Sequence, residues 1–161
     1  MVEIMTIGYQ GLTPKQFLDL VRRCGVERIV DVRELPISRR AGFAKTALST
    51  SLKSAGIAYT HVPALGCPRA IRHDYREDQN WARYTKRFCS YLATCDDTLQ
   101  ALAELARVER CCLLCFEEDF NFCHRSFVAE RLGEFTSALK INHLTGPIQG
   151  RVVEARALAA A

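Results

Sequence analysis

The sequence predicts an α/β fold, a three-layer sandwich with a mostly parallel sheet of about five strands. Short apolar runs, typical of buried strands, alternate with longer segments whose apolar residues recur at helical spacing. The first two runs are joined by a helical segment, and a strand–helix–strand unit favours parallel pairing. A chain of 161 residues has the length of one domain, so we expect residues 1–161 to form a single domain.

The first half of the chain shows clear helix boundaries. Thr13 is suited to an N-cap, Pro14 to the first helical turn and Gly25 to the end of the helix. The elements expected here are a strand at 3–8, a helix from Pro14 to Gly25, a strand at 28–33, a helix at 45–55 and a strand at 57–62. Residues 63–80 lack a regular pattern and are predicted to be irregular, and long irregular segments are often functional.

The second half repeats the alternation of helices and apolar runs. The expected elements are helices at 81–93 and 96–108, a strand at 111–116, a helix at 123–132 and a strand at 139–144. The run at 111–116 is apolar throughout, as expected for a central strand. The tail after Gly146 is weakly patterned, and we expect its final alanines to be either helical or frayed.

The composition is that of an ordinary globular protein, with 48% hydrophobic and 25% charged residues. The net charge of +4 permits an anionic partner but is weaker than the charge typical of nucleic-acid-binding domains. The chain begins without a signal-like segment and has no apolar run of about 20 residues, so we expect a cytoplasmic protein without a membrane partner. Its eight cysteines are then expected to be reduced.

The first candidate site follows from the predicted topology, because ligands of parallel α/β sheets bind outside the carboxyl ends of the strands. One such loop carries Cys115 and Glu117 and leads into a helix that begins with Cys123, His124 and Arg125. Backbone amides at a helix start favour an anion, including a thiolate at Cys123. We predict Cys123, Glu117, His124 and Cys115 to be catalytic, with Cys123 as the nucleophile and Glu117 or His124 as the acid or base. The alternative is that the cysteines only fill the core and His124 lies on the surface.

The second candidate site is formed by arginines. We predict that the substrate or another anion is bound by Arg33, Asp31, Ser38, Arg39, Arg125 and Arg69. Arg33 directly follows an apolar strand, which places it near the ligand-binding edge of the sheet. The alternatives are that Asp31 and Arg33 form a structural ion pair and that the basic residues around Arg69 are merely solvated.

A metal site is a more specific alternative to the catalytic interpretation of these residues. Cys115, Cys123 and His124 are residue types that bind zinc or iron, but their spacing is not that of a CxxC pair. Cys112 and Cys115 have that spacing, yet residues three apart on a strand face opposite sides of the sheet. We therefore predict no metal ligand set and identify no cofactor. A redox pair of Cys115 and Cys123 would require their Cα atoms to lie within ~7 Å.

Several motifs occur along the chain in a distinctive order. They are Thr6-Ile7-Gly8, Val30-Asp31-Val32-Arg33 with Pro36 and Ser38-Arg39, Leu65-Gly66 with Arg69, Cys115-Phe116-Glu117 with Cys123-His124-Arg125, and Asn142-His143-Leu144. In this order they resemble the family known as domain of unknown function 488. The resemblance implies a small intracellular α/β protein and supplies no activity. The chain departs from the family pattern at Tyr9 and Gln10, where His and Ser are usual, and at Cys67, where glycine is usual.

Three hypotheses about function follow. The first is an enzyme that acts on a phosphate-bearing substrate, such as a nucleotide or a nucleic-acid end, with a cysteine in its site. The second is a binding module that holds a nucleotide or nucleic acid without chemistry. The third is a metal- or redox-dependent protein that uses Cys115, Cys123 and His124. The expected partner is a small anionic or phosphate-bearing ligand, with nucleic acid as a further candidate.

Overall fold

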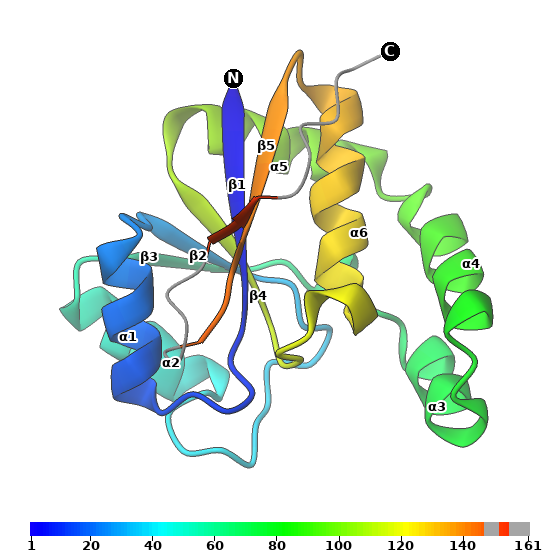
Figure 1. Ribbon diagram of the computed structural model, residues 1–161, viewed down its shortest axis with the longest axis horizontal. Coiled ribbons are helices and arrows are strands. Elements are labelled where there is room, and N and C mark those ends of the chain that lie inside the picture. Colours follow the sequence, from blue (N-terminus) through cyan, green and yellow to red (C-terminus); the bar gives the residue numbers. More distant parts are fainter. Residues whose placement is uncertain (147–151, 155–161) are drawn as a thin grey trace.

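A six-stranded sheet with the order β3-β2-β4-β1-β5-β6 forms the central layer (Figure 1). The computed structural model describes residues 1–146 and 152–154. The strands are β1 (Val2–Gly8), β2 (Arg28–Asp31), β3 (Ala58–His61), β4 (Cys111–Cys115), β5 (Leu139–Leu144) and β6 (Val152–Glu154). Strands β1 to β5 pair in parallel, and β6 pairs antiparallel with β5. The predicted α/β fold with a mostly parallel sheet is confirmed.

Helices cover both faces of this sheet. They are α1 (Pro14–Arg23), α2 (Lys45–Ser54), α3 (Arg69–Asp78), α4 (Trp81–Leu92), α5 (Asp96–Val108) and α6 (His124–Arg131), with 3₁₀ turns at Pro63–Leu65, Phe120–Phe122 and Leu132–Phe135. At the start of α1, Thr13 Oγ1 accepts a hydrogen bond from Gln16 N, and Gln16 Oε1 accepts one from Thr13 N. This capping box confirms the N-cap predicted at Thr13. None of the helices in residues 1–146 is long and apolar enough to cross a membrane.

Two apolar clusters lie on opposite faces of the sheet. One contains side chains of α1 and α2, including Phe17 and Leu48, and the other contains side chains of α4, α5 and α6, including Phe88. Along β4 the side chains alternate between the clusters, so that Cys112 faces the first and Leu113 the second. The three layers of the predicted sandwich are therefore helices, sheet and helices.

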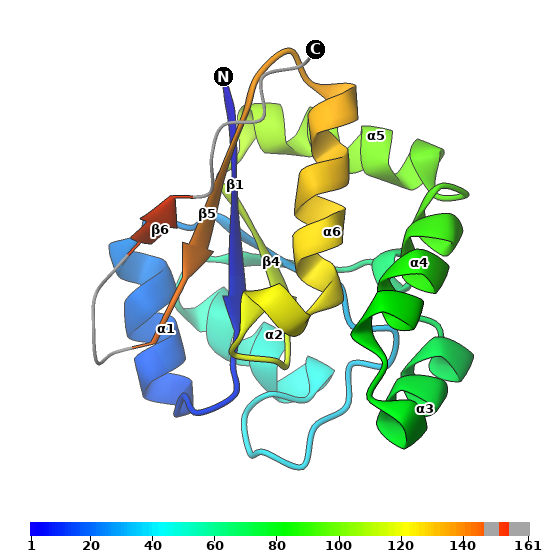
Figure 2. The same ribbon diagram turned by 45° about the vertical axis from the view of Figure 1, so that its right-hand side comes forward.

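The prediction of an irregular segment at 63–80 is wrong. A 3₁₀ turn and helix α3 occupy most of it, and α3 and α4 form a pair of helices beside α6 (Figure 2). Helix α3 buries only Ile71 fully, so it lacks the broad apolar stripe by which a helix is recognised. Its stability comes from contacts with α4, where Tyr75 packs against Trp81 and Asp74 pairs with Arg83.

The end of the chain was not predicted as a strand, yet β6 pairs with β5 at residues 152–154. Three residues are too few to show the alternation by which a strand is recognised. The alanines expected to be helical or frayed lie outside the described residues.

Candidate functional site

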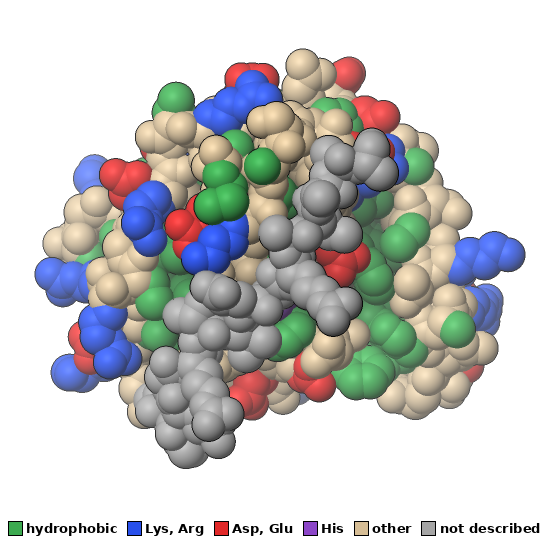
Figure 3. Space-filling view, turned by 45° about the horizontal axis from the view of Figure 1, so that its top comes forward, with side chains coloured by type: hydrophobic (Ala, Val, Ile, Leu, Met, Phe, Trp, Pro, Cys, Tyr) green, Lys and Arg blue, Asp and Glu red, His purple; other side chains and the backbone are tan. Residues whose placement is uncertain are grey.

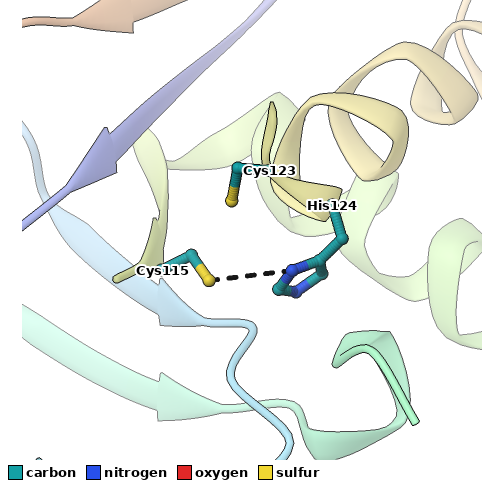
Figure 4. A group of neighbouring side chains, drawn as sticks. All are labelled: Cys115, Cys123 and His124. Carbon is teal, nitrogen blue, oxygen red and sulfur yellow. Dashed lines mark hydrogen bonds between the residues drawn. The ribbon is translucent and has the colours of Figure 1, made fainter. Parts of the chain in front are cut away.

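Strand β4 lies between β1 and β2, and its carboxyl end carries the first of the predicted catalytic residues. Cys115 is the last residue of β4. The chain then passes through a 3₁₀ turn and returns, so that Cys123 is the N-cap of α6 and His124 its first residue. Figure 4 shows the side chains of Cys115, Cys123 and His124 directed toward one another. The fold therefore brings together residues that the loop separates in the sequence.

Glu117 completes this cluster. Its Oε2 atom lies 3.1 Å from Cys115 Sγ and 3.3 Å from Cys123 Sγ. Cys115 Sγ lies 3.7 Å from His124 Nδ1, and the metal-ligating atoms of Cys115, Cys123 and His124 all lie within 4.8 Å of one another. All four residues predicted to be catalytic thus lie in one group, which we call the Cys–Glu–His cluster.

The orientation of His124 is set by a backbone carbonyl. His124 Nε2 lies 2.7 Å from Val32 O, and a carbonyl can only accept a hydrogen bond. When the ring is neutral its hydrogen is therefore on Nε2, and Nδ1 faces Cys115 Sγ. The ring of Phe88 contacts the imidazole edge-on, with ring centroids 5.3 Å apart. Neither the carbonyl nor Phe88 was singled out in the sequence, because a backbone carbonyl has no sequence signal and Phe88 belongs to an ordinary apolar helix face.

Burial raises the pKa of both thiols, and neighbouring groups then shift the two pKa values in opposite directions. Burial raises the pKa of Cys123, but hydrogen bonds with Cys115 and His124 and the charges of His124 and Arg125 hold this pKa well below its ordinary value. The hydrogen bond with Cys123, together with burial, raises the pKa of Cys115 well above its ordinary value. Burial and the nearby Cys123 raise the pKa of Glu117. These shifts favour a thiolate at Cys123 beside a neutral thiol at Cys115.

The backbone at Glu117 is held by two residues from elsewhere in the fold. Arg125 is fully buried and donates through Nη1 to Glu117 O and through Nη2 to Glu118 O. A Cβ atom at Gly8 would lie 1.6 Å from Glu117 O, so only glycine permits this approach of the loop to β1. The sequence indicated Gly8 as the end of a strand but not as the support of the Cys–Glu–His cluster.

Tyr84 and Cys67 lie near the cluster and were not predicted to belong to it. Burial raises the pKa of Tyr84, and Cys67, Cys123 and Cys115 raise it further. Burial likewise raises the pKa of Cys67, to about 11. Tyr84 lies on the buried face of α4. In the sequence it is therefore indistinguishable from the other apolar residues of that helix face.

The residues predicted to bind an anion are arranged differently. Arg33 donates to both carboxylate oxygens of Asp31, at 2.9 and 2.7 Å, and to Phe43 O at 2.8 Å. Asp31 also accepts a hydrogen bond from Tyr59 at 2.6 Å. The side chains of Arg33 and Asp31 are only 6% and 0% exposed. This geometry is that of a structural ion pair, the alternative considered for these two residues.

The other predicted anion-binding residues are dispersed. Arg125 contacts backbone carbonyls rather than solvent, and its Nε atom donates to Thr6 Oγ1 at 3.2 Å. Ser38 accepts a hydrogen bond from Arg40 N within its own loop. Arg39 and Arg69 are exposed. The predicted catalytic residues therefore lie close together. The buried arginines, in contrast, donate their hydrogen bonds to acceptors within the protein.

Comparison with known protein families gives a match over most of the chain. The model of the family described as "Domain of unknown function DUF488" matches residues 13–132, a range that includes the whole Cys–Glu–His cluster. No curated protein and no solved structure matches the chain.

Proposed function

The chain belongs to the DUF488 family, whose name carries no activity, and we propose that it is a metal-binding protein with its centre at the Cys–Glu–His cluster. The ligands are Cys115, Cys123 and His124, with Glu117 as the fourth. The convergence of these donors carries the proposal. In a tetrahedral zinc centre, bonds of about 2.0–2.3 Å place neighbouring ligand atoms about 3.3–3.8 Å apart. The contacts of 3.1, 3.3 and 3.7 Å and the 4.8 Å limit on the cysteine and histidine ligand atoms require shifts of up to about 1 Å to reach that arrangement.

The surroundings of His124 support the proposal. Histidines that bind metals usually donate their second ring N–H to a carbonyl or a carboxylate, which fixes the tautomer and the ring plane. The hydrogen bond from His124 Nε2 to Val32 O is of this kind. It leaves Nδ1, which faces Cys115, as the nitrogen available to a metal.

The charges of the cluster also favour a cation. The cluster would carry three negative charges, from the thiolates of Cys115 and Cys123 and the carboxylate of Glu117. Three negative charges in a largely buried space are unfavourable without positive charges beside them. A divalent cation together with the adjacent Arg125 guanidinium balances them. Two thiolates, an imidazole and a carboxylate form a donor set that suits zinc.

Metal analysis tests this proposal. Protein purified without chelators and in the presence of a non-thiol reductant is expected to contain about one zinc ion per chain by plasma mass spectrometry. Cys115→Ser and Cys123→Ser are expected to lose the ion while keeping their circular dichroism. Cys89→Ser is the matched control, because Cys89 is an exposed free cysteine on α4. The proposal would be refuted if the purified wild-type protein contained no metal and bound no zinc on titration.

A thiolate nucleophile at Cys123 is the second candidate, and the lowered pKa of Cys123 favours it, since hydrogen bonds and charges outweigh burial there. The metal centre ranks above it because a substrate must reach the sulfur directly, and Cys123 and Cys115 are only 2% and 5% exposed. Iodoacetamide labelling at pH 6 of chelator-treated protein separates the two. A reactive thiolate is labelled faster at Cys123 than at Cys89, and slow labelling at Cys123 counts against it.

Binding of a phosphate-bearing ligand or of nucleic acid remains a proposal for the exposed Arg39 and Arg69. On the described part of the face seen in Figure 3, basic and acidic side chains are interspersed and form no single basic area. Retention on a nucleic-acid column that falls steeply with salt would support a nucleic-acid partner. Retention that does not change with salt, or no retention at all, would count against it.

A further inference from the structure

The four donors of the cluster are not held equally. Cys115 ends a central strand, and Cys123 and His124 begin a helix; all three are at most 5% exposed. Glu117 lies in the loop between these elements and is only partly buried. Three donors are thus fixed by regular structure, and Glu117 is the most exposed of the four residues.

The Glu117 carboxyl group is held by few contacts. In residues 1–146 these are the contacts of Oε2 with the two sulfurs and a hydrogen bond to its own backbone. Its backbone is held by Arg125 through Glu117 O and by the close approach to Gly8. Rotation among staggered side-chain rotamers therefore moves the carboxylate without moving the loop.

From this asymmetry we propose that Glu117 is an exchangeable ligand, whose place on the metal is taken by a small monoanionic ligand from solution, such as a thiolate or a carboxylate. The inference rests on the proposed metal centre and adds the class of ligand that the centre takes. Catalytic zinc sites differ from structural ones in keeping one exchangeable position beside three protein ligands.

The charge of the site selects the class of ligand. With Glu117 turned away, a divalent ion, two thiolates and the buried Arg125 leave one uncompensated positive charge. A neutral ligand would leave this charge inside a largely buried site, whereas a monoanion replaces the charge of the carboxylate. A small ligand is required because the three fixed donors are almost fully covered.

Cobalt substitution of the full-length chain tests the inference. Co²⁺ bound to thiolates gives a charge-transfer band, and its d–d bands respond to a change of ligand. Azide serves as the monoanionic probe, and 2-mercaptoethanol as the thiolate, with a phosphine as the reductant. We expect both probes to change the d–d bands of the wild type in a saturable manner. Glu117→Gln, which removes the competing charge, is expected to bind azide about tenfold more tightly.

The matched control is Glu118→Gln, because the neighbouring Glu118 contacts Arg125 only through its backbone carbonyl. Its spectrum and azide affinity are expected to equal those of the wild type. The inference is overturned if azide leaves the d–d bands of both the wild type and Glu117→Gln unchanged, or if Glu117→Gln has the same cobalt spectrum and azide affinity as the wild type. Absence of the charge-transfer band in the wild type is a different result, which refutes the metal centre itself.

Discussion

Gly8 is the residue at which the smallest chemical change should have the largest effect. A methyl carbon there would lie 1.6 Å from Glu117 O, and both atoms are attached to backbone that has little room to move. Gly8→Ala is therefore expected to lower the free energy of unfolding by about 3 kcal/mol or more, measured by urea denaturation.

Gly133→Ala is the control for this substitution. The nearest atom to a Cβ at Gly133 is Leu139 Cδ2 at 3.8 Å, an ordinary contact. Its stability should stay within about 1 kcal/mol of the wild type. Equal losses at the two glycines would show that the close approach of Gly8 to the loop is not what requires glycine.

His143 makes stability depend on pH. Burial and the charge of Arg125 lower its pKa to about 4, and its Nδ1 atom lies 2.7 Å from Thr6 Oγ1. The ordinary pKa of histidine is about 6.5. Between this pH and about pH 4, His143 binds a proton in the unfolded chain but not in the folded chain. This contribution to stability is therefore complete above pH 6.5 and lost as the pH falls to about 4.

The test is urea denaturation of the wild type and of His143→Gln between pH 7 and pH 4. The variant should lose the part of the pH dependence that His143 supplies, of order 1–3 kcal/mol. An NMR titration that places the pKa of His143 near 6.5 in the folded protein would contradict this prediction.

At the level of elements, the carboxyl end of β2 depends on the buried pair of Asp31 and Arg33. Asp31→Asn leaves the Arg33 guanidinium without its counter-charge in a site that is 6% exposed, and we expect a loss of about 3–5 kcal/mol in urea denaturation. The double substitution Asp31→Asn with Arg33→Met removes the unpaired charge and should recover part of that loss.

The pair of Lys15 and Asp19 on α1 is the control, since both side chains are well exposed. Asp19→Asn should change stability little, because exposed ion pairs contribute little. A double variant at Asp31 and Arg33 that is less stable than Asp31→Asn alone would show that the pair does not act mainly through its charges.

At the level of the whole molecule, the proposed metal centre joins parts of the chain that are distant in sequence. It links the end of β4 to the start of α6 and, through the carbonyl of Val32, to the end of β2. An ion that binds only the folded chain stabilises it by mass action, by about 2.7 kcal/mol at one hundred times the dissociation constant. Zinc is therefore expected to raise the Tm of reduced wild-type protein in calorimetry, and a chelator should reverse the shift.

Cys123→Ser should remove most of this shift in Tm, and Cys89→Ser should retain it. A shift that is equal in both variants would mean that zinc binds elsewhere. Lower pH should weaken the shift, because thiolates and imidazole must lose their protons before they bind a metal.

Local patterns in the sequence were enough to predict the class of fold. The alternation of apolar runs with amphipathic segments predicted the parallel sheet, and Thr13 with Pro14 predicted where α1 begins. Gly25, with φ at +67°, was predicted as the end of that helix. Helix α3 was not predicted, because its stabilising contacts are with α4 rather than within its own sequence.

The sequence indicated which residues lie at the candidate site but not how their side chains are arranged. Chain order placed Cys115, Glu117, Cys123 and His124 at one strand end, because the topology of a parallel sheet directs such loops to the same edge. Whether donors converge depends on how a loop folds back and on which backbone groups hold it, and this information is absent from residue spacing. The sequence alone thus indicated an α/β protein with cysteine, histidine and acid at a strand end. Only the tertiary structure decided that Arg125 binds backbone carbonyls inside the protein. It also decided that the side chains of the Cys–Glu–His cluster lie in contact with one another.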